Sequence, residues 1–230
     1  MPLPEQGDAL QDPASRAFAP TRMELETPVS ASFLRRLQAM ELSYVTQDTP
    51  LRQCGFSGNE LRWKEQRSPI IQAIEGDGDL LNLGCANGYL LESLVHWAQL
   101  KDVFITPHGV DAGTKLIAFA RARHNVVRTN FHVGNVWDWA PPRKYRYVYT
   151  STELVHQEYL PQYLARVKQT MVEVGGRLIV GSYGSRRRNL PPIDLKEIFD
   201  AIGWKITGMS SAPGDVSMPV VARYAWMNVI

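Results

Sequence analysis

The sequence predicts an α/β protein whose mainly parallel sheet is covered by helices on both faces. From Asp79 onward, short apolar runs alternate with stretches whose apolar residues recur at helical spacing. Alternation of this kind requires crossover connections between parallel strands. A turn of small residues, Gly84-Cys85-Ala86-Asn87-Gly88, directly follows the first apolar run. Near the end of the chain, two strand-like segments are separated by a short loop, which predicts an antiparallel pair that closes the sheet.

The elements of this sheet follow one another in a regular order. Strands are expected at residues 80–83, 104–110, 126–133, 145–150 and 177–182. Helices are expected between them at residues 89–100, 114–123 and 159–172, with one more at 194–202. The antiparallel pair is expected at residues 204–212 and 219–230.

The first third of the chain has a different pattern. Residues 1–27 are rich in Pro, Ala, Gln and Asp without periodicity, and are expected to form a disordered tail. Thr27 and Pro28 look like the N-cap and first-turn proline of a helix. A second helix is expected to begin near Asn59, with Pro69 kinking or restarting it.

Composition limits the classes of function. The 230 residues suffice for one sizeable core plus an appendage, and the formal net charge of +2 is too small to indicate nucleic-acid or membrane binding. Two cysteines exclude a disulfide framework, and the histidine spacing predicts no metal site. There is no apolar run of roughly 18 residues, as a membrane span needs, and the first residues lack the apolar core of a secretory signal. A cytoplasmic protein is the expectation.

Polar residues stand where the predicted strands end. In an open α/β sheet, ligands bind beyond the carboxyl ends of the strands. Asp111 ends the second strand, where a carboxylate can accept from both vicinal hydroxyls of a ribose. Gly134-Asn135-Val136 ends the third strand and offers an amide and a main-chain N–H to an adenine edge. The glycine turn alone could be no more than a tight strand-to-helix turn, but the three strand ends together predict a nucleoside site.

The turn excludes two other nucleotide ligands. It lacks the GxGxxG register of a dinucleotide site and the Lys-Ser/Thr pair of a triphosphate site. The segments "LLNLGCANG", "GVDAG" and "VGN" instead resemble the first three motifs of class I S-adenosylmethionine-dependent methyltransferases. The resemblance covers roughly residues 79–230. The segments "CGFSGNELRWKEQR" and "GCANGYLLE" also resemble a group of small bacterial methyltransferases to which no substrate can be assigned.

This resemblance implies a Rossmann-like, seven-stranded, mainly parallel, doubly wound sheet whose last strand is antiparallel. It implies S-adenosylmethionine as cofactor, residues 76–230 as the methyltransferase domain, and residues 28–75 as a helical lid on the acceptor side. Gly84, Ala86 and Gly88 would border the methionyl part, Asp111 would hold the ribose, and Asn135 and Val136 would hold adenine. Asn82, Cys85, Ala112 and Thr150 complete the expected cofactor-binding set. Asn82 replaces the acid usual in the family, which removes a negative charge near the cofactor's ammonium, and Asn135 replaces a frequent Asp.

The segment after the fourth strand, "TSTELVHQEY", is expected to face the acceptor. It lacks an Asn-Pro-Pro-Tyr-like sequence and a Pro-Cys pair, which argues against methylation of nucleic-acid bases. Glu153 and His156 are three residues apart, so one helical turn would place them on one face. His156 is then the candidate general base and Glu153 its orienting partner, unless both only solvate a helix start.

Three functions remain open from the sequence. The first is transfer of a methyl group to an oxygen or nitrogen atom of a small molecule. The second is RNA methylation, favoured by Arg186-Arg187-Arg188 and disfavoured by the low net charge. The third is a non-catalytic protein that binds the cofactor or a partner, which the acid-to-Asn changes make conceivable. Neither the acceptor nor the oligomeric state follows from the sequence.

Overall fold

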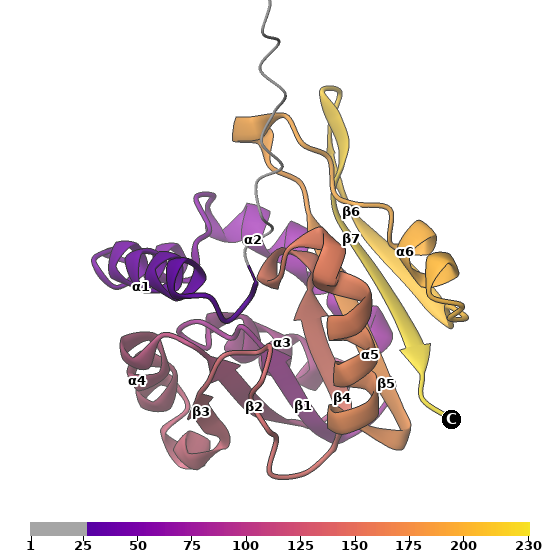
Figure 1. Ribbon diagram of the computed structural model, residues 1–230, viewed down its shortest axis with the longest axis horizontal. Coiled ribbons are helices and arrows are strands. Elements are labelled where there is room, and N and C mark those ends of the chain that lie inside the picture. Colours follow the sequence, from indigo (N-terminus) through magenta and orange to yellow (C-terminus); the bar gives the residue numbers. More distant parts are fainter. Residues whose placement is uncertain (1–26) are drawn as a thin grey trace, which may run out of the picture.

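The computed structural model describes residues 27–230, so almost all of the predicted tail lies outside the described residues. Seven strands form one sheet with the order β3-β2-β1-β4-β5-β7-β6. The strands are β1 Gly78–Leu83, β2 Ile105–Asp111, β3 Phe131–Val133, β4 Tyr145–Ser151, β5 Val172–Tyr183, β6 Gly208–Asp215 and β7 Met218–Asn228. The first five pair in parallel, and β7 lies antiparallel between β5 and β6. The predicted fold class is confirmed (Figure 1).

Helices cover both faces of this sheet, as predicted. One face packs against α3 Tyr89–Gln99, α4 Thr114–Arg123 and the 3-10 segment η2 Ser68–Ala73, whose apolar side chains share a core with β1. The other face packs against α5 Leu160–Met171 and α6 Leu195–Ala201. Alternate residues of β1 serve the two cores: Leu81 and Leu83 face α5, whereas Leu80 faces α3. The parallel strands are therefore apolar on both sides.

Three strand predictions differ from the structure. β6 is Gly208–Asp215, so the predicted bounds of residues 204–212 are wrong at both ends. β3 is three residues long because residues Asn125–Asn130 form the 3-10 segment η3, so the predicted start at residue 126 is wrong. Val126, whose apolar side chain suggested a strand, is 92% exposed. β5 begins at Val172, earlier than predicted, because α5 passes directly into the strand.

The helices of the first third also begin where local capping allows. α1, Ala31–Val45, starts three residues later than predicted, because Ser30 rather than Thr27 is the N-cap and accepts from the Phe33 amide at 3.1 Å. α2, Glu60–Arg67, has the predicted cap at Asn59. Pro69 ends it, and η2 continues the chain as a tighter helix.

These two helices have different relations to the core. In Figure 1, α1 and α2 lie above the edge of the sheet at which β1 to β4 end, here called the carboxyl edge. α1 buries no side chain, whereas Trp63 of α2 and Ile70, Ile71 and Ala73 of η2 are buried. Residues 68–73 therefore belong to the main core. The division of the chain at residues 27 and 75 remains a prediction.

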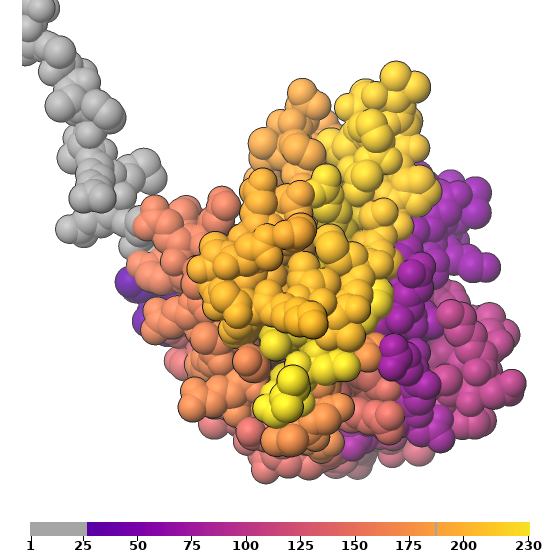
Figure 2. Space-filling view, turned by 90° about the vertical axis from the view of Figure 1, so that its right-hand side faces the viewer, coloured from indigo at the N-terminus to yellow at the C-terminus, as the bar shows by residue number. Residues whose placement is uncertain are grey.

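The C-terminal third forms the side of the molecule that faces the viewer in Figure 2. In both views, the β6–β7 turn and η6 Arg186–Arg188 project beyond the carboxyl edge. No helix within residues 27–230 is long and apolar enough to cross a membrane.

Candidate functional site

The turn after β1 has the backbone conformation that its glycines predict. Gly84 and Gly88 have φ angles of 71° and 76°, in the left-handed region that glycine enters without strain. Ala86 between them has φ 47°, which is costly for a residue with a Cβ. The amides of Gly84 and Cys85 donate to the Val110 carbonyl at 2.8 and 3.0 Å, which fixes the turn against β2.

Asp111, at the end of β2, connects the first two strand ends. Its Oδ2 accepts from the Ala86 amide at 2.9 Å, and its Oδ1 accepts from the Gly113 amide at 2.8 Å. Burial raises the pKa of Asp111 above its ordinary value of 3.8, against the effect of these two hydrogen bonds, and the carboxylate of Glu41 adds to the increase. The carboxylate thus holds the glycine turn beside the start of α4. Ala112 is partly buried next to it.

Asn135 follows β3, and both polar atoms of its side chain bond protein groups. Its Oδ1 accepts from the Trp137 amide at 3.1 Å, and its Nδ2 donates to the Pro28 carbonyl at 2.7 Å. Val136 is 8% exposed, and its side chain packs in the core beneath α5. The structure therefore brings the three predicted strand ends together, because β3, β2 and β1 are neighbours in the sheet.

Besides Val136, three of the predicted cofactor residues have buried side chains. The Cys85 side chain packs in the α3 core, and burial raises its thiol pKa well above the ordinary value. The Thr150 hydroxyl bonds the Tyr163 hydroxyl at 2.7 Å, on the face covered by α5. Only main-chain atoms of these two residues remain for a ligand. The third, Asn82, is 2% exposed, and its Oδ1 has no hydrogen-bond partner in the described part of the chain.

Residues of the first third, and one residue after β4, also lie against these strand ends. Glu41 of α1 accepts from the Lys115 amide at 2.6 Å and so caps α4, whose own N-cap Gly113 has no side chain to do so. A Cβ on Gly84 would lie 2.5 Å from Cδ2 of Leu154, so that side chain covers the glycine turn. No local sequence pattern indicates these contacts, because they join segments far apart in the chain.

Asn87, inside the turn, is another residue of the site that was not predicted from the sequence. It is completely buried, and its Nδ2 donates to the Pro50 carbonyl at 2.8 Å. Its Oδ1 accepts from the Tyr89 amide at 3.2 Å, at the start of α3. A single amide side chain therefore ties the segment before α2 to the glycine turn. An Asn between two glycines was the available signal, since this residue favours turns and helix starts.

The predicted acid–base pair does not share a helical turn. Glu153 lies in η4 Thr152–Leu154, and extended Val155 separates it from His156, so the expectation of one continuous turn is wrong. Oε1 of Glu153 accepts from the Tyr183 amide at 2.8 Å, whereas Nδ1 of His156 accepts from the Glu158 amide at 3.4 Å. Both side chains are exposed beyond the end of β4. A catalytic role for either residue remains a prediction.

Three tryptophans near the strand ends serve packing. Trp63 is 3% exposed, stacks edge-on against Phe56, and donates to the Ser93 hydroxyl at 2.9 Å. Trp137 and Trp139 pack beside the core beneath α5.

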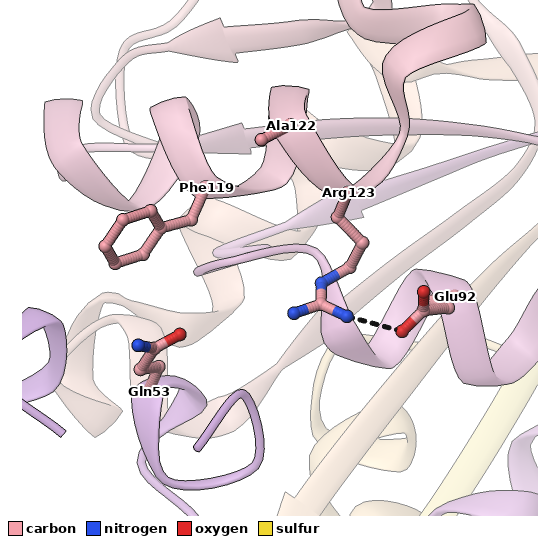
Figure 3. Close-up of a pocket in the computed structure, with 5 residues that line it drawn as sticks. All are labelled: Gln53, Glu92, Phe119, Ala122 and Arg123. Atoms are coloured by element: carbon pink, nitrogen blue, oxygen red, sulfur yellow. Dashed lines mark hydrogen bonds and ion pairs between the residues drawn. The ribbon is translucent and has the colours of Figure 1, made fainter. Parts of the chain in front are cut away.

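Two surface cavities lie away from the strand ends. One, of about 380 Å³, is bounded by the 3-10 segment η1 Arg52–Cys54, α3 and α4, and the Arg123–Glu92 ion pair crosses it at 2.6 Å (Figure 3). The other, of about 320 Å³, lies between α2 and α3. Pro28, Glu41 and Leu154 instead lie against the strand ends, over the predicted nucleoside site.

Comparison with known proteins adds the fold but no sequence family. No protein-family model matches the chain, and no curated protein sequence matches it either. The structure of the DhpI–SAH complex aligns with a TM-score of 0.52 at 20% identity, over 84% of this chain and 93% of that one. A chain from the complex of the Haloferax volcanii Trm112 methyltransferase activator with its methyltransferase partner gives 0.52 at 12% identity, over 73% and 90%.

The same fold also occurs in a protein that is named for a cyclisation and not for methyl transfer. The cyclase SpnF aligns with a TM-score of 0.53 at 13% identity, over 71% of this chain and 81% of that chain. Structural similarity at identities this low shows a shared fold and does not show a shared reaction. The chain has the fold of the class I S-adenosylmethionine-dependent methyltransferases.

Proposed function

We propose that this protein is an S-adenosylmethionine-dependent methyltransferase that acts on an oxygen or nitrogen atom of a small molecule. The observation that carries the proposal is the hydrogen bond from the Ala86 amide to the Asp111 carboxylate, 2.9 Å long. It joins the bare glycine turn and the predicted ribose-binding acid into one unit. Asn135 lies on the next strand end, where an adenine edge would follow the ribose.

The residues present fit the cofactor at three points. Gly84 leaves the main chain of the turn accessible to a methionyl chain once the Leu154 side chain rotates away. Each Asp111 oxygen accepts from one main-chain amide and keeps a second lone pair for a ribose hydroxyl. The buried Asn82 Oδ1 is an acceptor without a donor, which a positively charged ammonium group would satisfy. When bound, the cofactor supplies a methyl group on a sulfonium, which is reactive without further activation.

The remaining work of the protein is alignment and exclusion of water. Correct alignment of two reactants is worth roughly 7–11 kcal/mol of the barrier. α1, the segment before α2 and η4 lie over the strand ends and would exclude water from them. Where the acceptor is a hydroxyl, His156 is the proposed general base, because it stands exposed just beyond β4. Glu153 is held by the end of β5 and would orient the acceptor rather than the imidazole.

A small acceptor is favoured over RNA by the charge distribution. The net charge is only +2, and Arg186 of the arginine cluster pairs with Asp215 at 2.8 Å. Among the alternatives, a non-catalytic cofactor-binding protein shares every feature of the nucleoside site, so turnover has to be measured directly.

The test of the proposed function has two stages. Calorimetry should detect binding of S-adenosylhomocysteine by the full chain, and Asp111→Ala should weaken it by about 10²-fold, since two charge-assisted hydrogen bonds are lost. Incubation with S-adenosylmethionine and a bacterial small-molecule extract should then release S-adenosylhomocysteine. His156→Ala should slow this release by roughly 10²–10⁴-fold for a hydroxyl acceptor. Absence of cofactor binding in the wild type would refute the proposal.

A further inference from the structure

Arg67, the last residue of α2, is surrounded by aromatic side chains. Its guanidinium lies 3.7 Å from the centroid of the Tyr183 ring and 5.1 Å from that of the Trp63 ring. Burial lowers the pKa of this guanidinium, but the hydroxyls of Tyr183, Tyr224 and Tyr149 raise it by more. Tyr149 and Tyr224 are buried, whereas Arg67 and Tyr183 are partly buried.

This guanidinium lacks the partner that a cation in such a position normally has. Within residues 27–230, no ion pair includes Arg67, although Arg123, Arg143 and Arg177 each pair with a carboxylate. Its polar contacts within residues 27–230 are a 3.5 Å hydrogen bond to Oε1 of Gln66 and a hydrogen bond with the Tyr224 hydroxyl. A guanidinium has five N–H donors, so most of its donor capacity is unused. A carboxylate would match its planar fork.

The unpartnered Asn82 Oδ1 lies on the same face of the sheet. Leu81 and Leu83 point to the α5 face, so Asn82 between them points to the α3 face. Its neighbour across the β1–β4 pairing is Tyr149, whose side chain belongs to the α3 core. The Tyr149 hydroxyl bonds that of Tyr183, on which Arg67 stacks. Asn82 and the Arg67 guanidinium are thus linked through Tyr149 and Tyr183 on this face of the sheet.

We propose that Arg67 binds the carboxylate of the cofactor's amino-acid tail, while Asn82 accepts from the tail's ammonium. An α-amino acid is a zwitterion, and these two side chains supply the complementary groups. The inference rests on the proposed function, since it needs a cofactor whose methionyl part borders Gly84. It assigns a role to the segment before η2 that the strand-end motifs do not include. The carboxylate of the tail would bind the guanidinium N–H groups that have no acceptor, and the Tyr183 ring would move aside where it blocks them.

The rival explanation is that Arg67 only stabilises the fold. Cation–π contacts with Tyr183 and Trp63 could by themselves hold α2 against β5. The two explanations differ in ligand dependence. A structural role makes Arg67 equally important for every ligand of the site, whereas a carboxylate-binding role affects only ligands that carry the carboxylate.

The test compares S-adenosylhomocysteine with its decarboxylated analogue, 5′-adenosyl-3-thiopropylamine, by calorimetry on the full chain. The wild type should bind the analogue about 10- to 100-fold more weakly, as expected for one charge-assisted bidentate contact. In Arg67→Met, this ratio should fall to nearly 1, because only the carboxylate-bearing ligand loses affinity. Arg67→Lys should give an intermediate ratio, since it keeps the charge but loses the fork.

Lys64→Met is the matched control, because it removes the same charge from the exposed face of the same helix. It should leave the ratio at the wild-type value. Analogue binding within Arg67→Met reports whether that variant is folded. A wild-type ratio retained in Arg67→Met overturns the inference and leaves the proposed function standing. Failure of both ligands to bind the wild type overturns the proposed function as well.

Discussion

The side-chain amide of Asn135 donates to the main-chain carbonyl of Pro28 at 2.7 Å. This bond joins the beginning of the described chain to the end of β3, at the position predicted for adenine. Glu41 of α1 makes a similar bridge to the start of α4, next to Asp111. The first third of the chain therefore occupies groups that the nucleoside would need. Cofactor binding should move α1 and the segment before it.

Truncation should separate the parts of the first third. Deletion of residues 1–27 should have no effect, and deletion of residues 1–45 should leave a folded protein, because α1 buries no side chain. Deletion of residues 1–75 should abolish cooperative unfolding, since Ile70 and Ile71 are 0% and 4% exposed and each stabilises the fold by about 1.5–3 kcal/mol. Circular dichroism with thermal melting measures this. A cooperative transition in the longest truncation would show that the core does not need η2.

Removal of α1 should also change cofactor binding. Without residues 1–45, Asn135 and the start of α4 are free of the Pro28 and Glu41 contacts. S-adenosylhomocysteine should then associate faster in stopped-flow measurements, because no segment has to move first. It should dissociate faster as well, because nothing covers the bound ligand. Equal rates in the full-length and truncated proteins would contradict a covering role for α1.

Two opposite substitutions test the strain of the glycine turn. Gly84→Ala should lower the free energy of unfolding by about 1–2 kcal/mol, because φ 71° is unfavourable for a residue with a Cβ. Ala86→Gly should not lower it and should raise it by up to about 1 kcal/mol, because φ 47 ° is already strained in the wild type. Urea unfolding of both variants measures the difference. Effects of the same sign would disprove the turn conformation.

Cofactor affinity should fall on acidification. Burial and the carboxylate of Glu41 raise the pKa of Asp111, so its charge is lost at a higher pH than that of an ordinary aspartate, whose value is 3.8. In the proposed function the carboxylate accepts from the ribose, so affinity should be full above the raised pKa and decrease as the pH falls through it. Calorimetric titrations of S-adenosylhomocysteine over this range provide the test. Asp111→Asn should bind weakly with little pH dependence, and an equally steep decrease in that variant would assign the effect elsewhere.

RNA should bind only weakly. The net charge is +2, and Arg186 is paired with Asp215 on the projecting segment. Filter binding at low salt and at about 0.2 M salt is the measurement, because purely electrostatic binding decreases steeply between these conditions. Tight binding retained at the higher concentration would favour RNA as the acceptor.

The sequence by itself determined the sheet and the positions of its polar strand ends. Apolar periodicity separated strands from helices, and the glycine turn, Asp111 and Asn135 followed because residues after parallel strands meet at one edge. The same reasoning failed at residues 126–130, where two valines suggested a strand although Val126 is exposed. Short apolar runs do not distinguish a strand from a tight helical turn, because burial depends on neighbours that the local sequence does not specify.

Only the tertiary structure decided what lies on those strand ends. Pro28 reaches Asn135 across more than a hundred positions, and Arg67 reaches Tyr183 at the end of β5. Such contacts depend on where crossover connections carry each segment, and no local pattern records them. The pair Glu153 and His156 shows the converse. Their spacing fitted a helix, but the backbone is extended at Val155 and the Glu153 carboxylate accepts from the Tyr183 amide. A hydrogen bond to a distant strand outweighs a weak local helix propensity.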